Sequence, residues 1–264
     1  MVIDVILPAG GRIAGLTAKT GTDVKALFPL AGKSLLRRTL QTLRATSCFG
    51  KIVVVGPSEV AKDCGAEVAA FLPETDSGAN NVLRGLSWLR ANQPESSSRR
   101  LLLMGTDLPF VTPAALRHFL DACPPEAELC LPVIERREFE ARFPHQQTKY
   151  VPLRDGQWMI GCTMLVNPAI FIRNEPLIRR LFAARRSTLA MARLLGLRFI
   201  FGLLMHQLTI AQVQEKCLSL LGCSGQAIYG CPPELGFDID YPSDYQYATQ
   251  HIQLAWSLLG ERCV

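Results

Sequence analysis

Two glycines and two cations near the start of the chain have the types and the order that phosphate binding requires. Gly10 and Gly11 follow a short apolar run, and Arg12 and Lys25 come after them. Glycine directly after a strand lets the backbone approach a phosphate or a base closely, because no Cβ stands in the way. The two cations supply the charge that a triphosphate needs. The spacing fits neither a P-loop nor a G-x-G-x-x-G fingerprint, which disfavours a nicotinamide enzyme.

Acidic residues form a second group of candidates. Asp107 follows another apolar run, and Asp238 and Asp240 stand in Phe-Asp-Ile-Asp-Tyr-Pro-Ser-Asp near the end of the sequence. Carboxylate oxygens suit Mg²⁺, which often takes only one or two of them together with phosphates. The plain alternatives are a helix cap for Asp107 and a Tyr-Pro turn for Asp240.

The elements that position these residues alternate between strand and helix patterns. Short apolar strands alternating with helices favour a mostly parallel sheet covered on both faces. Ligands of such sheets bind outside the carboxyl ends of the strands, so the strand ends after Leu7 and Met104 are expected to face one cleft. The expected strands are 2–7, 51–55, 67–72, 101–107 and 129–134, and the expected helices are 35–43 with Ser34 as its N-cap, 81–89, and one capped by Thr112.

The second half has a different pattern. Residues 175–221 predict a nearly continuous helix rich in Leu and Arg, and 227–229 a further strand. The basic doublets Arg179-Arg180 and Arg185-Arg186 are interpreted as a solvated helix face, in preference to a polyanion or membrane contact. Asp155-Gly156 predicts a hairpin turn. Residues 94–98 are linker-like but too short to mark a domain boundary.

Composition narrows the class of protein. The chain has 264 residues, 48% of them apolar, which suits one large α/β domain or one domain with a sizeable insertion. Its net charge of +5 fits a small polyanionic substrate as well as it fits nucleic acid. No aromatic residues interleave with basic ones, so a nucleic-acid partner is not expected. The nine cysteines form no Cys-x-x-Cys pair, which predicts reduced thiols in a cytoplasmic protein. The first residues do not fit a signal peptide, and no apolar stretch is long enough for stable membrane insertion.

Three motifs together resemble the molybdopterin-guanylyltransferase-like nucleotidyltransferases. They are Leu-Pro-Ala-Gly-Gly at 7–11, Lys-Ala-Leu-Phe-Pro-Leu-Ala-Gly-Lys-Ser at 25–34 and Thr-Asp-Leu-Pro-Phe at 106–110. The resemblance covers residues 2–110 and resumes at 237–245. It implies a Rossmann-like three-layer α/β/α nucleotide-diphospho-sugar transferase fold with a mixed, mostly parallel sheet. Within a single domain over 1–264, we expect a nucleotide-binding half over 1–135, an acceptor-side region over 136–226 with a helical insertion at about 175–222, and a return strand and C-terminal helix over 227–264.

The activity that this resemblance implies is Mg²⁺-dependent transfer of a nucleoside monophosphate from an NTP to a small phosphorylated acceptor. Phosphate is already anionic, so this nucleophile needs no general base, and catalysis reduces to positioning and charge neutralisation. The resemblance assigns catalysis to Lys25, nucleotide binding to Leu7, Pro8, Ala9, Gly10, Gly11, Asn80, Asn81, Gly85 and Thr106, and metal ligation to Asp107 and Asp240 with Asp238 as competitor. Arg12 is expected to take over the catalytic role of the arginine that the family carries nearby. Gly161 and Cys162, which follow the predicted hairpin, are expected to bind the acceptor.

Three alternatives stay open. A related glycosyltransferase would use Asp238-Ile-Asp240 as its metal-binding Asp-x-Asp. The Arg-Met pair common in the family is replaced by Ile-Ala-Gly-Leu at 13–16, which puts the role of Arg12 in question and admits an inactive nucleotide-binding regulator. A peripheral membrane protein would use the Arg-rich helical region. The base, the acceptor and the oligomeric state, a homodimer included, are not fixed by the sequence.

Overall fold

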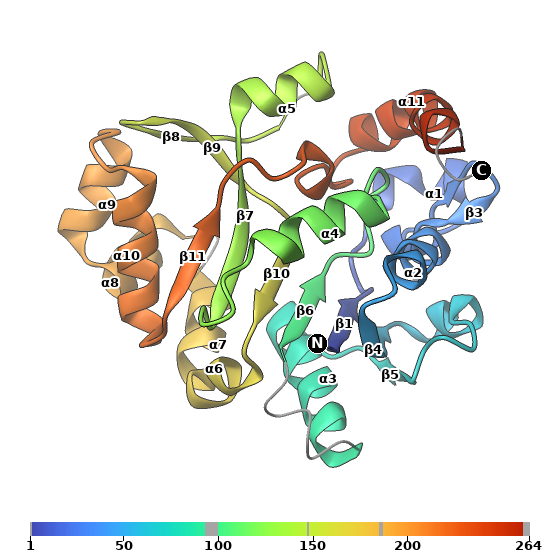
Figure 1. Ribbon diagram of the computed structural model, residues 1–264, viewed down its shortest axis with the longest axis horizontal. Coiled ribbons are helices and arrows are strands. Elements are labelled where there is room, and N and C mark those ends of the chain that lie inside the picture. Colours follow the sequence, from blue (N-terminus) through green and yellow to red (C-terminus); the bar gives the residue numbers. More distant parts are fainter. Residues whose placement is uncertain (1, 93–99, 147, 185–186, 261–264) are drawn as a thin grey trace.

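The computed structural model describes residues 2–92, 100–146, 148–184 and 187–260 (Figure 1). The linker-like residues 94–98 and the doublet Arg185-Arg186 therefore lie outside the described residues. The strands are β1 Ile3–Pro8, β2 Pro29–Leu30, β3 Lys33–Ser34, β4 Phe49–Gly56, β5 Ala70–Pro73, β6 Leu101–Met104, β7 Leu129–Glu135, β8 Val151–Leu153, β9 Gly156–Ile160, β10 Thr163–Val166 and β11 Gly225–Ile228. The α-helices are α1 Thr17–Thr20, α2 Leu35–Thr46, α3 Gly78–Asn92, α4 Pro113–Ala122, α5 Arg136–Arg142, α6 Pro168–Arg173, α7 Glu175–Ala184, α8 Thr188–Leu195, α9 Leu197–Leu204, α10 Ile210–Leu221 and α11 Pro242–Gly260.

One mixed sheet runs through the molecule in the order β5-β4-β1-β6-β10-β7-β9-β8, and β11 pairs with β7. The four strands β5, β4, β1 and β6 are parallel. β10 is antiparallel to both β6 and β7 and lies between them (Figure 1). The α/β fold with a mixed, mostly parallel sheet is therefore confirmed.

Helices cover both faces of this sheet, because strand residues point alternately to opposite sides. Val5 and Leu7 of β1 belong to one buried cluster, to which α2, α4, α5 and α11 also contribute. Ile6 belongs to a second buried cluster on the opposite face, together with residues of α3 and α6. The three-layer arrangement follows from this alternation.

The helix caps follow the sequence closely. The Ser34 side chain accepts a hydrogen bond from Arg37 N at 3.2 Å, and that of Thr112 accepts one from Ala115 N at 3.0 Å. Both satisfy a backbone donor that has no partner within the helix. The strand expected over 67–72 begins later, at Ala70. The hairpin at Asp155 is present, with Leu153 paired to Gly156 across the turn.

The helical insertion is not one continuous helix, which corrects the prediction for 175–221. Four helices, α7 to α10, occupy this part of the chain. Ser187 caps α8, Gly196 separates α8 from α9 with a positive φ of 96°, and Thr209 caps α10 with a capping box. Periodicity alone missed these breaks, since leucines continue on both sides of each one.

An irregular segment between β9 and β10 shifts the pairing with β7. Val133 pairs with Ile160, but Cys130 pairs with Leu165, so four residues lie opposite two. A bulge of this kind bends the strand and redirects its side chains, often beside a functional site. The extra residues include Gly161 and Cys162. Cys162 accepts a backbone hydrogen bond from Gly105 at 3.1 Å, which joins the bulge to the loop after β6.

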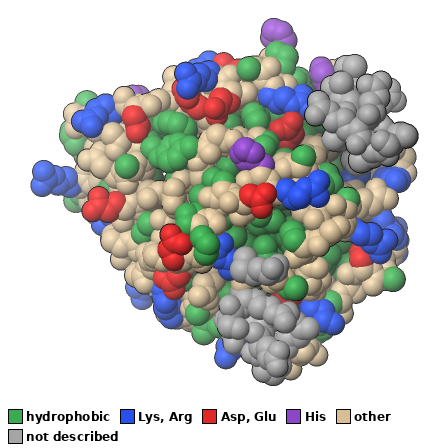
Figure 2. Space-filling view, in the orientation of Figure 1, with side chains coloured by type: hydrophobic (Ala, Val, Ile, Leu, Met, Phe, Trp, Pro, Cys, Tyr) green, Lys and Arg blue, Asp and Glu red, His purple; other side chains and the backbone are tan. Residues whose placement is uncertain are grey.

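On the face seen in Figure 2, acidic and basic side chains are interspersed. Among the residues described, none of the helices combines the length and the apolar character needed to traverse a bilayer.

Candidate active site

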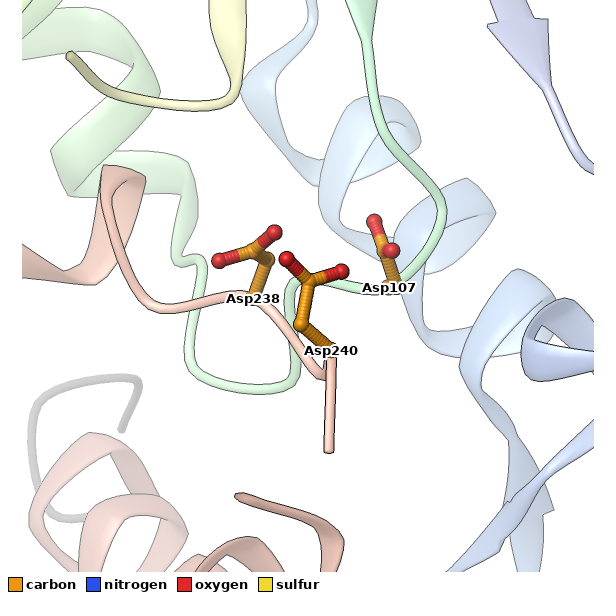
Figure 3. Close-up of side chains that lie close together, drawn as sticks. All are labelled: Asp107, Asp238 and Asp240. Atoms are coloured by element: carbon orange, nitrogen blue, oxygen red, sulfur yellow. The ribbon is translucent and has the colours of Figure 1, made fainter. Parts of the chain in front are cut away.

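Three aspartates converge beyond the carboxyl end of β6. Asp107 comes from the loop after β6, and Asp238 and Asp240 come from the segment before α11 (Figure 3). Their nearest carboxylate oxygens all lie within 4.8 Å of one another. The competing ligand Asp238 thus lies in the same cluster as the two aspartates that the family resemblance favoured. The expectation of one cleft at the strand ends agrees with this placement.

Lys25 supplies the positive charge in this cluster. Its Nζ donates to Asp107 Oδ2 at 3.0 Å and to Asp240 Oδ1 at 2.6 Å. Burial lowers the pKa of Lys25, but the charge of Asp107 and the hydrogen bonds to both carboxylates raise it more, so the net direction is upward. The side chain is 11% exposed and is held as a cation. Residues separated in sequence by 82 and 215 positions therefore form one ionic group.

The pKa of Asp238 reports the same crowding of negative charge. Burial raises it to about 7, and the neighbouring Asp107 and Asp240 add to the rise. Burial also raises the pKa of the Cys162 thiol well above its ordinary value, with a further contribution from Asp238. Cys162 is therefore a neutral thiol beside the carboxylates. A nucleophilic role would need the opposite shift.

Backbone hydrogen bonds hold the acidic segment in place. Ile239 N donates to Asp107 O at 3.1 Å, which joins the segment before α11 to the loop after β6. The buried carboxylate of Asp244 accepts from Asp240 N at 2.9 Å and from Tyr241 N at 2.7 Å. An aspartate in the first turn is the expected acceptor for free amides at a helix start. Asp244 was not among the predicted residues, because its hydrogen bonds to these two backbone amides become apparent only in the folded structure.

The glycine loop begins where β1 ends and passes beside Lys25. Lys25 N donates to Gly11 O at 2.9 Å, so the loop and the lysine form one unit. Leu7 and Ala9 are buried as whole residues, whereas Pro8 and Gly10 are half-buried and Gly11 is exposed, so these three form the part of the loop that a ligand can reach. A Cβ added to Gly10 would lie 2.3 Å from Glu74 Oε2, and one added to Gly11 would lie 3.2 Å from Lys25 Cδ. A side chain at position 10 would therefore displace the carboxylate of Glu74, and one at position 11 would press on the stem of Lys25.

Arg12 lies at the rim of the loop and forms an ion pair with Glu74. Its Nη1 donates to Gly10 O at 3.0 Å and to Glu74 Oε2 at 3.2 Å. The hydrogen bond to Glu74 raises the pKa of Arg12, and the charges of Glu74 and Asp23 add to this. Arg12 is thus turned to the loop backbone and Glu74. The sequence analysis did not identify Glu74, because its partner Arg12 is 62 positions away and no local motif links the two.

The other predicted nucleotide-binding residues occupy different surroundings. Asn81 is buried, and its Oδ1 accepts from Thr75 N at 2.6 Å, which orders the connection from β5 to α3. Asn80 is half-buried and bonds to Asp76 and Arg179. Gly85 packs α3 against β1, since an added Cβ would lie 3.0 Å from the Ile6 side chain. Thr106 is buried directly before Asp107.

A cavity of about 700 Å³ opens beside the aspartates. Asp238 and Asp240 lie on its wall with Cys162, and Lys149 and Tyr241 lie at the same opening. The Lys149 ammonium lies 5.7 Å from the centre of the Tyr241 ring. Gly161 does not line the cavity. It packs instead against Pro132 and Leu235, where an added Cβ would lie 2.7 Å from Pro132 Cγ.

Comparisons with known proteins show which family and which folds this chain resembles. Residues 5–207 match the family model described as MobA-like NTP transferase domain. A hypothetical transferase structure from Thermus thermophilus is 31% identical, with a TM-score of 0.79 over 92% of this chain and 99% of its own. No curated protein sequence matches.

Two more distant structures share the fold. The 4-diphosphocytidyl-2C-methyl-D-erythritol synthase of Anaerococcus prevotii has a TM-score of 0.58 at 11% identity, over 96% of each chain. A Mycobacterium tuberculosis protein solved in complex with manganese has a TM-score of 0.51 at 17% identity, over 95% of this chain and 99% of its own.

Proposed function

Because the chain belongs to the family of MobA-like NTP transferase domains and is a nucleotidyltransferase, we propose that it moves a nucleoside monophosphate from an NTP to a small phosphorylated acceptor. The observation that carries the proposal is the cluster of Lys25, Asp107 and Asp240 between the glycine loop and the cavity. An acceptor phosphate oxygen attacks the α-phosphorus, the bond to the β-phosphate breaks, and pyrophosphate leaves.

The three carboxylates fit a divalent cation. They offer only oxygen ligands, which Mg²⁺ prefers. Burial and, after it, the charges of Asp107 and Asp240 raise the pKa of Asp238, and a cation would neutralise that charge. The manganese complex of the Mycobacterium tuberculosis structure supports a divalent ion in this fold. We propose Asp107 and Asp240 as the ligands, with Asp238 beside them. When bound, the ion neutralises charge on the phosphate oxygens and orients them.

The residues of the chain have separate parts in this proposal. The loop over 7–11 holds the base and ribose through its accessible members Pro8, Gly10 and Gly11. Lys25 exchanges its carboxylate partners for the phosphates and stabilises the charge that grows on them. Arg12, turned toward Glu74, orders the loop.

The cavity beside Asp240 is the proposed site of the acceptor. Lys149 at its opening supplies one cation for the acceptor phosphate, and Cys162 on its wall adds a neutral thiol. We propose accordingly a nucleotide-binding half over 1–135 and an acceptor-side region over 136–226, to which Asp240 and Tyr241 of the C-terminal segment add. The nucleophile approaches from the cavity and pyrophosphate departs over the glycine loop.

Thermal stabilisation by each of the four NTPs, with and without Mg²⁺, tests the proposal. A ligand that binds only the native state raises the melting temperature with the logarithm of its concentration over its dissociation constant. We expect one NTP to stand out, with a shift that requires Mg²⁺ and that Asp107→Asn removes. The control is Asp121→Asn, an exposed aspartate at the end of α4. No shift with any NTP would contradict the proposal.

Pyrophosphate release completes the test. With the selected NTP, release should depend on a phosphorylated acceptor and fall in Lys25→Met. Removing one group that stabilises developing charge typically lowers kcat about 100- to 1000-fold. NTP binding without pyrophosphate release, across sugar, polyol and cofactor-precursor phosphates, would favour a regulatory protein instead.

A further inference from the structure

Helix α9 presents an unusual apolar surface. Leu197, Phe201 and Leu204 are 74%, 61% and 61% exposed, the highest values among the large apolar side chains described. Met205, directly after the helix, is 54% exposed. Successive members of this group are four, three and one positions apart in the sequence, which places them on one side of the helix. We call these four residues the α9 patch. Clustered exposed apolar side chains mark an interaction site, whereas single ones do not.

The two flanks of α9 beside the patch fix the helix to the protein. Ile200 and Gly202 are buried, and a Cβ added to Gly202 would lie 3.1 Å from Leu208. The helix also packs against α8 (Figure 1). The α9 patch is therefore held outward by packing on either side of it, and the exposed residues cannot turn inward without loss of that packing.

The segment that carries the patch is strongly basic. Residues 176–214 contain six arginines and no acidic residue, while the rest of the chain has 22 basic and 23 acidic residues. The net positive charge of the protein therefore comes from this segment. Arg180, Arg193 and Arg198 are exposed, and the ion pairs of the described residues include none of the three. Arg198 follows the first residue of the patch.

The charge argues against a second copy of the chain as the occupant. An isologous dimer through this face would bring the same surface of both subunits together and would place arginines opposite arginines. Like charges brought together at an interface are unfavourable. A partner for this face must therefore combine negative charge with an apolar layer.

We propose that the α9 patch docks on an anionic phospholipid surface. Leucine, phenylalanine and methionine side chains enter the boundary between headgroups and acyl chains, while Arg193 and Arg198 contact the phosphates. A nucleic acid would pair with the same arginines but would leave the four apolar side chains of the patch in water, so it fits this face less well. Binding of this kind lies on the membrane and does not cross it. It needs no NTP turnover and is therefore independent of the proposed function.

Co-sedimentation with vesicles tests the proposal. The full chain is mixed with vesicles of phosphatidylcholine alone, or of phosphatidylcholine and phosphatidylglycerol in equal parts, at low and high salt. We expect binding to the anionic vesicles only, and weaker binding at high salt. The double variant Phe201→Gln, Leu204→Gln should bind more than about tenfold more weakly, since the side chains no longer enter the membrane. Arg198→Gln should weaken binding about fivefold.

Matched controls carry the same changes elsewhere on the surface. Ile172→Gln removes a 39% exposed apolar side chain of α6, and Arg137→Gln removes an arginine whose side chain is 80% exposed. Both should bind vesicles as the wild type does. The NTP-dependent melting shift of the double variant should equal that of the wild type, which separates this proposal from the proposed function.

Several outcomes would overturn the inference. Equal binding to neutral and anionic vesicles, or unchanged binding by the double variant, removes its basis. Binding of a labelled single-stranded RNA in preference to vesicles would assign the surface to nucleic acid. A dimer in light scattering that the double variant dissociates would assign it to a second copy of the chain.

Discussion

Replacement of Lys25 with methionine removes the cation from a group of three carboxylates. Lys25 Nζ contacts Asp107 at 3.0 Å and Asp240 at 2.6 Å, and Asp238 lies in the same cluster. Methionine keeps most of the apolar stem that lies beside Gly11, so the change is mainly one of charge. We expect a less stable protein that divalent cations stabilise more than they stabilise the wild type.

The size of the effect follows from exposure. The Asp107 side chain is 20% exposed, so loss of its charged hydrogen bond costs about 1.5–3 kcal/mol. The Asp240 side chain is 59% exposed and solvent screens its pair, which limits that contribution to less than about 1 kcal/mol. The free energy of unfolding should therefore fall by about 1.5–4 kcal/mol. For a chain of this size that corresponds to a fall in melting temperature of about 3–16 °C.

Differential scanning fluorimetry in a Mg²⁺ titration measures both effects. Without metal, Lys25→Met should melt below the wild type, and Mg²⁺ should raise its melting temperature by the larger amount. Lys33→Met is the control, because this exposed lysine makes one hydrogen bond, to Gln41 at 3.2 Å. Equal melting temperatures of Lys25→Met and wild type, or equal responses of the two to Mg²⁺, would refute the ionic cluster as described.

Three further substitutions test separate contacts. Asp244→Ala leaves two backbone amides without their acceptor and should lower the free energy of unfolding by about 2–4 kcal/mol in urea titrations; a loss below about 0.5 kcal/mol would contradict this. Gly85→Ala overpacks α3 against Ile6 and should cost about 1–3 kcal/mol while the NTP dissociation constant stays unchanged; weaker NTP binding without loss of stability would instead favour the predicted nucleotide contact. Gly10→Ala displaces Glu74 and should weaken NTP binding in calorimetry, and an unchanged affinity would remove the loop from the site.

Local motifs were sufficient to predict much of the site. Lys25, Asp107 and Asp240 each stand in a short pattern whose residue types match phosphate or metal chemistry, and the structure brings all three together. The parallel strand rule predicted a common cleft, because carboxyl ends of parallel strands meet at one edge. The roles assigned to these residues remain predictions.

Other features depend on contacts that no local pattern encodes. Glu74 forms its ion pair with Arg12, which is 62 positions away in the sequence. Asp244 accepts hydrogen bonds from the backbone of the turn before α11. Only the fold brings these partners together. The antiparallel strand β10 was not predicted, because its four residues are too few to separate a strand from a short helix segment. The exposure of the α9 patch was not predicted either. Periodicity identifies the apolar side of a helix, but it does not show whether other parts of the protein cover that side.

The position of β10 governs the order in which the protein can be assembled. β6 and β7 are neighbours in sequence, yet β10 separates them, so the sheet has a gap in its middle until residues 163–166 are available. An unfilled space between two buried strands leaves backbone donors and acceptors without partners. During synthesis, the emerging nucleotide-binding half therefore carries an open edge along β6. This topology therefore creates a risk of aggregation before β10 is added. A chaperone would be needed at that stage to prevent it.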